Sequence, residues 1–198
     1  MLPEREESLP SLPPDPTRML TTQKLFDART ILICGEITGE VARDVVAQLL
    51  ALSAVSDDDI FLYIHSPGGH VESADTIHDM MSFVRPRIIA VGTGWVASAG
   101  AHIFLAAEKE DRFCLPNTRF LLHQPAGGAG GRATDIEIEA GEILKMRARL
   151  NRIIAERTGQ PLKRVEKDTE RNFWMTAQEA QDYGLVGKII TSVDELKR

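Results

Sequence analysis

The sequence predicts an α/β fold built on a mainly parallel β-sheet. Three short apolar runs, each ending in glycine, are typical of buried strands. The segments between them have apolar residues at the spacing of one helical face. Strands that alternate with helices of about 10–15 residues indicate parallel strands joined by helical crossovers. The runs are RTILICG (29–35), DIFLYIHSPGG (59–69) and RIIAVGTG (87–94).

The helices predicted between these strands follow from the spacing of apolar residues. Segments 39–55 and 73–84 each place such residues along one helical face, and Pro86 ends the second. A further helix is expected after the third strand, from about Ser98 to Ala107. The apolar stripes consist of Val41, Val45, Val46, Leu49 and Leu50, and of Ile77, Met80, Met81 and Val84.

A long helix is predicted in the C-terminal half of the chain. The strand RFLLHQP (119–125) leads into the glycine-rich segment 126–131. The letters TDIE then predict a capping box, with Thr134 at the N-cap and Glu137 at position N3, and the helix runs to about Thr158. Such a helix looks too long for simple packing on this domain, so we expect it to project and dock on a partner.

The last elements complete a single expected domain over residues 21–198. A second capping box, TAQE (176–179), predicts a short helix that stops at Gly184, and a final strand is expected at 186–190. Residues 1–20 are acidic and rich in proline, so we expect a disordered or processed N-terminal tail.

The composition excludes several functional classes. The 198 residues suit one domain with a sizeable core, and the net charge of −6 comes without the basic stripe that nucleic acids require. No apolar run reaches the roughly 18 residues of a membrane span, and no signal peptide is evident, so a cytoplasmic location is expected. No histidine or cysteine cluster has metal-ligand spacing. Cys34 and Cys114 lie in apolar runs and are expected to be buried and reduced.

One serine stands where a strand gives way to a helix. In GWVASAGAHI (94–103), Ser98 follows the third strand and precedes the next predicted helix. As a nucleophile it would use the N–H of Ala99, and a second donor such as the N–H of Gly69, to hold an oxyanion. It could equally cap the helix. Spacing alone leaves both interpretations open.

A serine nucleophile needs a base, and the chain has five histidines. His123 ends a strand beside a glycine-rich loop, where sites gather in α/β sheets, and His65 also ends a strand. His70 follows the glycine turn and could line a site. His78 is predicted to be solvated on the polar side of its helix. These residues and His102 leave the base unassigned on the sequence alone.

Several motifs in the same order resemble the Clp-type serine peptidases, the family of the ClpP proteolytic subunits. They are LYIHSPGG, GWVASAGA, RFCLPNTRFLLHQPAGG, ATDIEIEAGEILKMRARLN and DTERNFWMTAQEAQDYGLV, between about Arg29 and Ile190. The resemblance implies a crotonase-like ββα superhelical core with a protruding handle, here about residues 124–158. It also implies two stacked heptameric rings fed by a Clp family ATPase. ATP would be used only by that partner, and no bound cofactor or metal is implied.

The resemblance further implies roles for individual residues. Ser98 would be the nucleophile, His123 the general base and Asn172 the third member of the triad. The backbone N–H groups of Gly69 and Ala99 would form the oxyanion hole. The remaining roles are substrate binding by His70, Val71, Gln124 and Pro125, coupling of ring contact to the site by Glu170 and Arg171, and ATPase docking by Phe61, Tyr63 and Phe83.

Asn172 departs from the family pattern, which usually has aspartate at this position. An asparagine oxygen can accept the same hydrogen bond from the histidine, but it carries no charge to stabilise the imidazolium. In the Ser-His-Asp template, the aspartate-to-asparagine change lowers kcat about 10⁴-fold. Asp168, four residues earlier, is an alternative partner for the histidine.

These residues support three functional hypotheses. The first is a serine endopeptidase subunit that cleaves unfolded proteins delivered by an ATPase. The second, favoured by Asn172, is a weakly active or structural ring subunit that pairs with an active paralogue. The third is an acyl-CoA enzyme on the same core, for which Glu72 is the nearest carboxylate. Only TTQKLFDART (21–30) aligns with the family's N-terminal pore-loop segment.

Overall fold

The structure of the protein, a computed structural model, describes residues 16–128 and 130–196. Its centre is one β-sheet with the strand order β1-β2-β3-β4-β7, in which β5 pairs with both β3 and β6. The pairs are parallel except for β5 with β6. The predicted α/β class is confirmed. The strands are β1 (Thr30–Cys34), β2 (Ile60–Ser66), β3 (Ile88–Ala97), β4 (Arg112–Cys114), β5 (Arg119–Leu122), β6 (Phe173–Thr176) and β7 (Lys188–Ile189).

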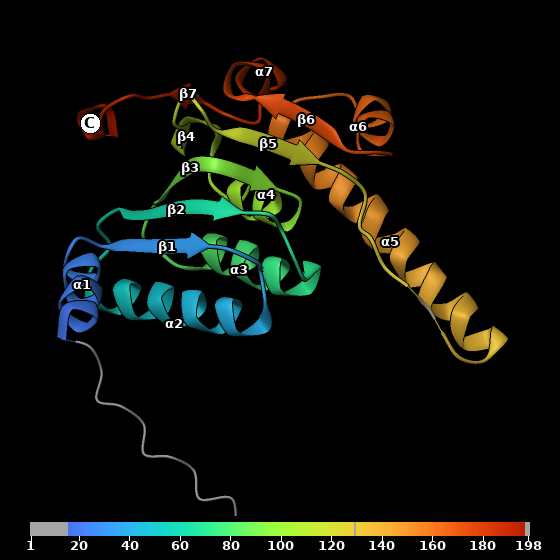
Figure 1. The fold of residues 1–198 in the computed structure, drawn as a ribbon, viewed down its shortest axis with the longest axis horizontal. Coiled ribbons are helices and arrows are strands. Elements are labelled where there is room, and N and C mark those ends of the chain that lie inside the picture. The colour runs from blue at the N-terminus through green and yellow to red at the C-terminus, as the bar shows by residue number, and fades with distance from the viewer. Residues whose placement is uncertain (1–15, 129, 197–198) are drawn as a thin grey trace, which may run out of the picture.

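Helices cover one face of this sheet, while one long helix leaves it. Helices α2 and α3 lie side by side beneath the strands, and α5 extends away from the body (Figure 1). Within the described residues, no helix is both long and apolar enough to cross a membrane. The helices are α1 (Pro16–Asp27), α2 (Gly39–Val55), α3 (Val71–Phe83), α4 (Ala99–Phe104), α5 (Ala133–Thr158), α6 (Leu162–Asp168) and α7 (Ala177–Tyr183).

The main hydrophobic core lies between the sheet and these helices. Alternate residues of the strands, such as Leu62 and Ile64 of β2, point to this face and pack against Leu49 of α2 and Ile77 of α3, all fully buried. A smaller cluster on the opposite face gathers around Phe113. The sheet therefore has one heavily covered face and one partly open face.

The open face corrects one prediction about the cysteines. Alternation along the edge strand β1 points Leu32 and Cys34 to the opposite side from the buried Ile31 and Ile33, which leaves Leu32 47% exposed and Cys34 exposed as well. Cys114, in contrast, is buried as predicted, and burial raises the pKa of its thiol to about 12.

Helix α5 begins one residue earlier than its predicted cap. Arg132 holds the N-cap position and makes no capping hydrogen bond with its side chain, so the predicted box of Thr134 and Glu137 is wrong. Thr134 already lies inside the first turn. The buried residues of α5 fall only in its last turns, such as Ile154, so the first half of the helix extends from the domain without covering it.

Two other boundaries differ from the prediction. Helix α1 starts at Pro16, inside the range 1–20 that we expected to be disordered or processed, and residues 1–15 lie outside the described residues. Helix α4 is shorter than predicted, since it ends at Phe104. The second capping box is confirmed, because Thr176 and Glu179 form both of its reciprocal hydrogen bonds.

Candidate active site

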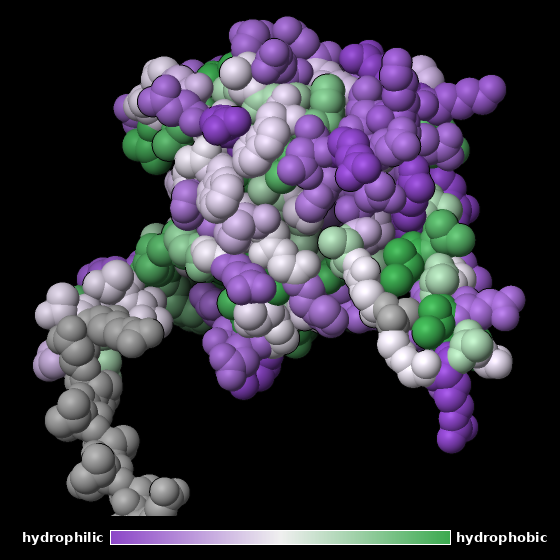
Figure 2. Space-filling view, turned by 45° about the vertical axis from the view of Figure 1, so that its right-hand side comes forward, coloured by the Kyte–Doolittle hydropathy of each residue, from purple (hydrophilic) through white to green (hydrophobic). Residues whose placement is uncertain are grey.

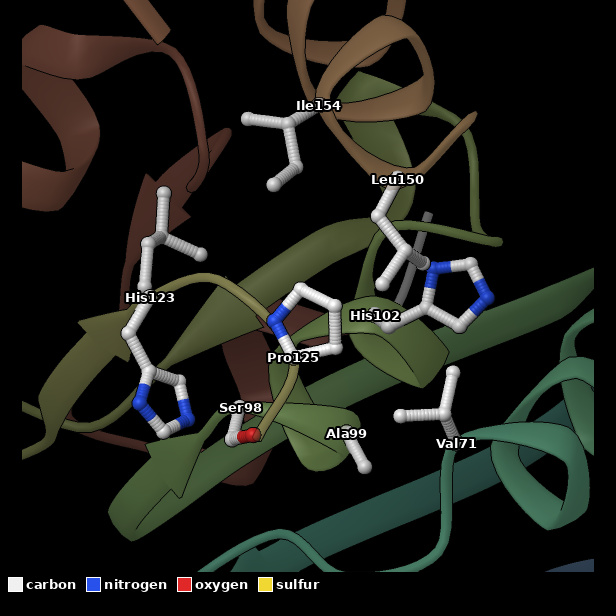
Figure 3. A pocket seen from close by; sticks show the side chains of 9 residues that line it. Val71, Ser98, Ala99, His102, His123, Pro125, Leu150 and Ile154 are labelled. Carbon is white, nitrogen blue, oxygen red and sulfur yellow. The ribbon is translucent and has the colours of Figure 1, made fainter. Parts of the chain in front are cut away.

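Two predicted site residues meet in one pocket at the carboxyl end of the sheet. Ser98 directly follows β3 and His123 directly follows β5, and these strands are parallel neighbours with Ala97 paired to Leu121. Figure 3 shows the imidazole of His123 directed toward Ser98 at one side of the pocket. The pocket is lined by Val71, Ser98, Ala99, His102, Leu122, His123, Pro125, Leu150 and Ile154.

The backbone at Ser98 does not have the conformation of an ordinary helix cap. Its φ of 54° and ψ of −119° lie where L-residues rarely occur, and its side chain makes no capping hydrogen bond. The Ser98 N–H donates to the carbonyl of Leu121 at 2.9 Å, which fixes the turn against β5. Strain of this kind persists where a site requires it. The hydroxyl is therefore left free for chemistry.

A glycine turn packs directly against this serine. A Cβ on Gly68 would lie 2.7 Å from the Ser98 Cβ, and Gly68 has a φ of +103°, so only glycine fits here. The chain around Gly69 is held by Ile37, whose N–H donates to the Gly68 carbonyl and whose carbonyl accepts from the His70 N–H, both at 2.8 Å. Among the described contacts, neither the Gly69 N–H nor the Ala99 N–H has an acceptor. These are the two donors predicted for an oxyanion.

Strand β6 brings the third predicted triad member close to the second. The last pair of the antiparallel β5–β6 ladder joins Leu122 to Phe173. The adjoining residues are His123 and Asn172, so their backbones leave the sheet side by side. Asn172 is nevertheless exposed and does not line the pocket. Among the described residues, no hydrogen bond links His123 to Ser98 or to Asn172, and such bonds often tighten only with substrate bound.

The turn that carries Asn172 is tied to the strand that carries His123. The backbone N–H of Gln124 donates to the Thr169 carbonyl at 2.6 Å, and the Gln124 Nε2 donates to the Glu170 carbonyl at 2.7 Å. The side chains of Glu170 and Arg171 are exposed in this single chain. Their predicted role in ring contact stays a prediction.

Asp168, the alternative partner for His123, is engaged elsewhere. The hydroxyl of Tyr183 donates to its Oδ2 at 3.1 Å, and Arg164 forms an ion pair with the same oxygen at 3.5 Å. Burial, with Asp168 beside it, raises the pKa of the Tyr183 hydroxyl. The geometry therefore favours Asn172 over Asp168 beside His123.

The four predicted substrate-binding residues divide into two groups. Val71 and Pro125 line the pocket, whereas the backbone N–H groups of His70 and Gln124 already donate to protein carbonyls. A substrate strand would therefore have to pair with other backbone groups of these two segments. Glu72, on which an acyl-CoA enzyme would depend, lies 3.0 Å from the His70 Nε2 and does not line the pocket.

A polar network that the sequence did not indicate lies behind the pocket. The buried His102 donates from Nε2 to Asp75 at 2.9 Å, and Arg149 of α5 binds both oxygens of Asp75. Burial of Asp75 opposes its ionisation, but the hydrogen bonds from His102 and Arg149 hold the pKa of its carboxyl far below the usual range. The place of His102 beside the site could have been found from the sequence spacing, because His102 follows Ser98 by one turn of α4.

His78 belongs to the same network, so its predicted solvation is wrong. Its side chain is only 15% exposed, and its ring stacks on that of His102 with centroids 4.4 Å apart. Burial, and then the neighbouring His102, lower the pKa of His78 to about 4. The error arose because α4 packs against the side of α3 that its own sequence presents as polar.

The three aromatic residues predicted for ATPase docking do not form one cluster in this chain. Phe61 and Tyr63 are half-buried on the open face of β2, against the cluster around Phe113. Phe83 ends α3 and is 76% exposed, and none of the described ring contacts joins it to the other two. In residues 16–128 and 130–196, no three His, Cys, Asp or Glu side chains gather closely enough for a metal ion.

Comparison with known proteins gives the same family throughout. The profile of the family described as "Clp protease" matches residues 16–193. The ATP-dependent Clp protease proteolytic subunit 3 of Rhizobium meliloti is 60% identical over 176 residues, covering 89% of this chain and 90% of that protein. Subunit 2 of Pseudomonas aeruginosa is 53% identical over 168 residues, covering 85% and 84%.

Solved structures agree with these sequence matches. ClpP1 of Listeria monocytogenes is 56% identical and superposes with a TM-score of 0.81, covering 89% of this chain and 99% of that one. A mutant of the same protein with aspartate in place of an asparagine is 58% identical, with a TM-score of 0.84 and the same coverage. The chain described here therefore belongs to the Clp protease family and has the fold of its ClpP proteolytic subunits.

Proposed function

We propose that the chain is a serine peptidase subunit that cleaves peptide bonds through an acyl-enzyme at Ser98. The observation that carries this proposal is the placement of a strained serine and a histidine in one pocket. Beside them lie two N–H groups that have no acceptor among the described residues. Nucleophile, base and oxyanion donors are the parts that acyl transfer needs.

The reaction follows from these positions. His123 accepts the proton of the Ser98 hydroxyl as the oxygen attacks the scissile carbonyl, and the Gly69 and Ala99 N–H groups donate to the developing oxyanion. The imidazolium then gives its proton to the departing amine, which leaves an ester on Ser98. Water, deprotonated by His123, hydrolyses that ester and restores the serine. No cofactor takes part in these steps.

Asn172 supports a second form of the proposal, in which the subunit is weakly active and pairs with an active paralogue. Its amide can orient His123 but cannot stabilise the imidazolium with a charge. The two relatives named above carry the numbers 3 and 2, and an asparagine-to-aspartate mutant of Listeria ClpP1 has been solved. A mixed assembly would supply full activity from the partner ring.

Self-association into stacked heptameric rings is part of the same proposal. The protruding half of α5 carries apolar side chains toward solvent, seen as green atoms at the lower right of Figure 2. The large apolar side chains exposed on this half of the helix are Ile136, Ile138 and Leu144, at 41%, 57% and 62%. Exposed apolar side chains gathered on a projecting element mark a contact surface. Glu170 and Arg171 would lie at the ring contact and transmit it to Asn172.

The proposal is tested by covalent labelling with a small fluorophosphonate, which reacts with activated serines. One adduct is expected, on the peptide that contains Ser98, because this hydroxyl has both a histidine and two free N–H donors beside it among the residues that the structure describes. Intact mass and peptide mapping measure it. Ser98→Ala should take no label, while Ser82→Ala, which changes an exposed serine of α3, should label normally. A chain left unlabelled at Ser98, even after Asn172→Asp, would contradict serine catalysis.

A Clp family ATPase is proposed to feed the ring and to dock on the open face of the sheet. Tyr63→Ala is expected to weaken ATPase binding about tenfold or more, since aromatic anchors dominate interfaces. Titration of the assembled ring with the ATPase measures this, and hydrolysis of short peptides should be unchanged. Tyr63→Phe is the matched control, because the hydroxyl makes no hydrogen bond with the described residues and the ring is kept. Unaltered ATPase affinity in Tyr63→Ala would rule out docking at this residue.

A further inference from the structure

Asp75 joins two helices, α4 and α5, that both contribute side chains to the pocket. Its Oδ1 accepts from the His102 Nε2 at 2.9 Å and from Arg149 at 2.8 Å, and its Oδ2 accepts from Arg149 at 2.6 Å. His102 belongs to α4, which begins directly after Ser98, and Arg149 belongs to the projecting helix α5. One carboxylate of α3 thus connects the helix behind the nucleophile to a residue 74 positions away.

The His102 ring has no freedom in this arrangement. It is 7% exposed, it stacks on His78 with an interplanar angle of 1°, and its Nε2–H is held by Asp75. Its Nδ1 is buried and has no hydrogen-bond partner. A buried imidazole that keeps one nitrogen unsatisfied is unfavourable for folding alone, and such exceptions call for an explanation. His102 is also part of the pocket lining, between Leu150 and Val71 in Figure 3.

Arg149 ties the α5 part of the pocket to the same carboxylate. Leu150 follows it directly and Ile154 follows one turn later, and both line the pocket. The bidentate contact of Arg149 with Asp75 therefore sets how far these two side chains reach toward Ser98. Apart from Ser98, His102 and His123, the residues that line the pocket are apolar, so its width decides which side chain it can hold.

We propose that Asp75 is a positioning residue that fixes the width of this pocket, and thereby the size of the substrate side chain accepted beside Ser98. That side chain belongs to the residue on the acyl side of the cleaved bond. The inference rests on the proposed peptidase function. Asp75 itself does not line the pocket and contacts neither Ser98 nor His123, so it acts on selectivity through His102 and Arg149.

Hydrogen exchange tests the structural half of this inference without requiring activity. Asp75→Asn keeps the shape of the side chain but removes the charge that holds Arg149. Amide exchange in residues 147–154 is expected to become about tenfold faster, as expected for local opening of a weakened contact, with β2 still protected. Asp44→Asn is the matched control, since it removes an exposed ion pair with Arg43 on helix α2, outside this network.

A second variant guards against simple loss of stability. Arg149→Gln should increase amide exchange in residues 147–154 by the same factor. The double variant with Asp75→Asn should exchange no faster than either single variant, because both changes remove the same contact. Unchanged exchange in 147–154 overturns the inference. Loss of protection throughout the sheet in both single variants also overturns it, because the contact would then serve only global stability.

Peptide selectivity tests the functional half. Fluorogenic peptides that differ only in alanine, leucine or phenylalanine at the acyl-side position are compared for kcat and KM. For Asp75→Asn, the ratio of kcat/KM for the leucine peptide to kcat/KM for the alanine peptide is expected to change about tenfold. Apolar pockets discriminate between side chains that differ by a methylene on this scale. Labelling by a small fluorophosphonate, which places no side chain in the pocket, should change less than about twofold.

The outcomes separate this inference from the proposed function. An equal loss for every peptide and for the label would mean that Asp75 acts on Ser98 chemistry, which overturns a role in selectivity. Wild-type-like selectivity in Asp75→Asn overturns it as well. If neither the wild type nor Asn172→Asp labels at Ser98, the proposed peptidase fails, while the exchange measurement still decides whether Asp75 holds the pocket wall.

Discussion

Replacement of Ser98 by alanine is expected to reduce hydrolysis of short peptides to the residual activity of the pocket. Without the hydroxyl no acyl-enzyme forms, and in a serine peptidase with a full triad the loss of the nucleophile lowers kcat about 10⁶-fold. Triad residues act as a unit, so a chain already weakened at Asn172 should lose much less than the same chain carrying Asn172→Asp. Initial rates with a fluorogenic peptide, in both backgrounds, measure the difference.

The control for this experiment is another serine on a neighbouring helix. Ser82→Ala alters an exposed position of α3 and should leave the rate unchanged. The free energy of unfolding of Ser98→Ala, measured by thermal unfolding, should stay within about 0.5 kcal/mol of the wild-type value. The hydroxyl makes no capping hydrogen bond that could be lost. Full activity in Ser98→Ala would show that hydrolysis arises elsewhere, or from a contaminating peptidase.

Asn172→Asp is expected to increase kcat by up to about 10⁴-fold, equivalent to about 5.5 kcal/mol of activation free energy. The carboxylate would accept the Nδ1–H of His123, fix its tautomer and stabilise the imidazolium by its charge. The amide of Asn172 can accept the same hydrogen bond but has no charge. The two residues already leave the β5–β6 ladder side by side, and Asn172 is exposed, so little desolvation opposes the new charge. Steady-state kinetics of wild type and variant, at equal states of assembly, measure the gain.

Asp168→Asn provides the matched comparison. It should leave the rate nearly unchanged, because Asp168 accepts from Tyr183 and pairs with Arg164 rather than with His123. The opposite result, with Asn172→Asp silent and Asp168→Asn inactive, would assign the orienting role to Asp168. A wild type that is already fast and gains nothing from Asn172→Asp would show that an amide suffices.

The sequence predicted those parts of the site that depend on local order along the chain. Ser98 and His123 each follow an apolar strand, and the carboxyl ends of neighbouring parallel strands meet at one edge. The glycine turn was predicted from the letters SPGGH, with Gly69 as the donor, and the structure adds that Gly68 lies too close to Ser98 to carry a Cβ. Local order also gave the second capping box at Thr176.

What the sequence did not predict depends on contacts between distant segments. The ion pair of Asp75 with Arg149 spans 74 positions, and only the folded α5 brings the two together. His78 was misplaced because a helical pattern shows one apolar face and cannot show that α4 covers the other side. The box at Thr134 failed for a smaller reason. Helix α5 begins two residues earlier than a cap at Thr134 would allow, at an exposed start where helix boundaries are weakly fixed.

The turn that carries Asn172 is attached through Gln124, so only a small free energy is needed to move Asn172 away from His123 in a single subunit. Two hydrogen bonds of Gln124 hold this turn to β5, and each contributes about 1 kcal/mol net. Their loss would separate Asn172 from His123 at about 2 kcal/mol, well below the free energy of unfolding a domain. In a lone subunit, Asn172 would then be separated from His123 for roughly 3% of the time. A contact on the turn that contributes a similar free energy could raise or lower this population, and the activity with it. Control of the proposed triad would therefore need no rearrangement of the sheet, only a shift of the four residues 169–172.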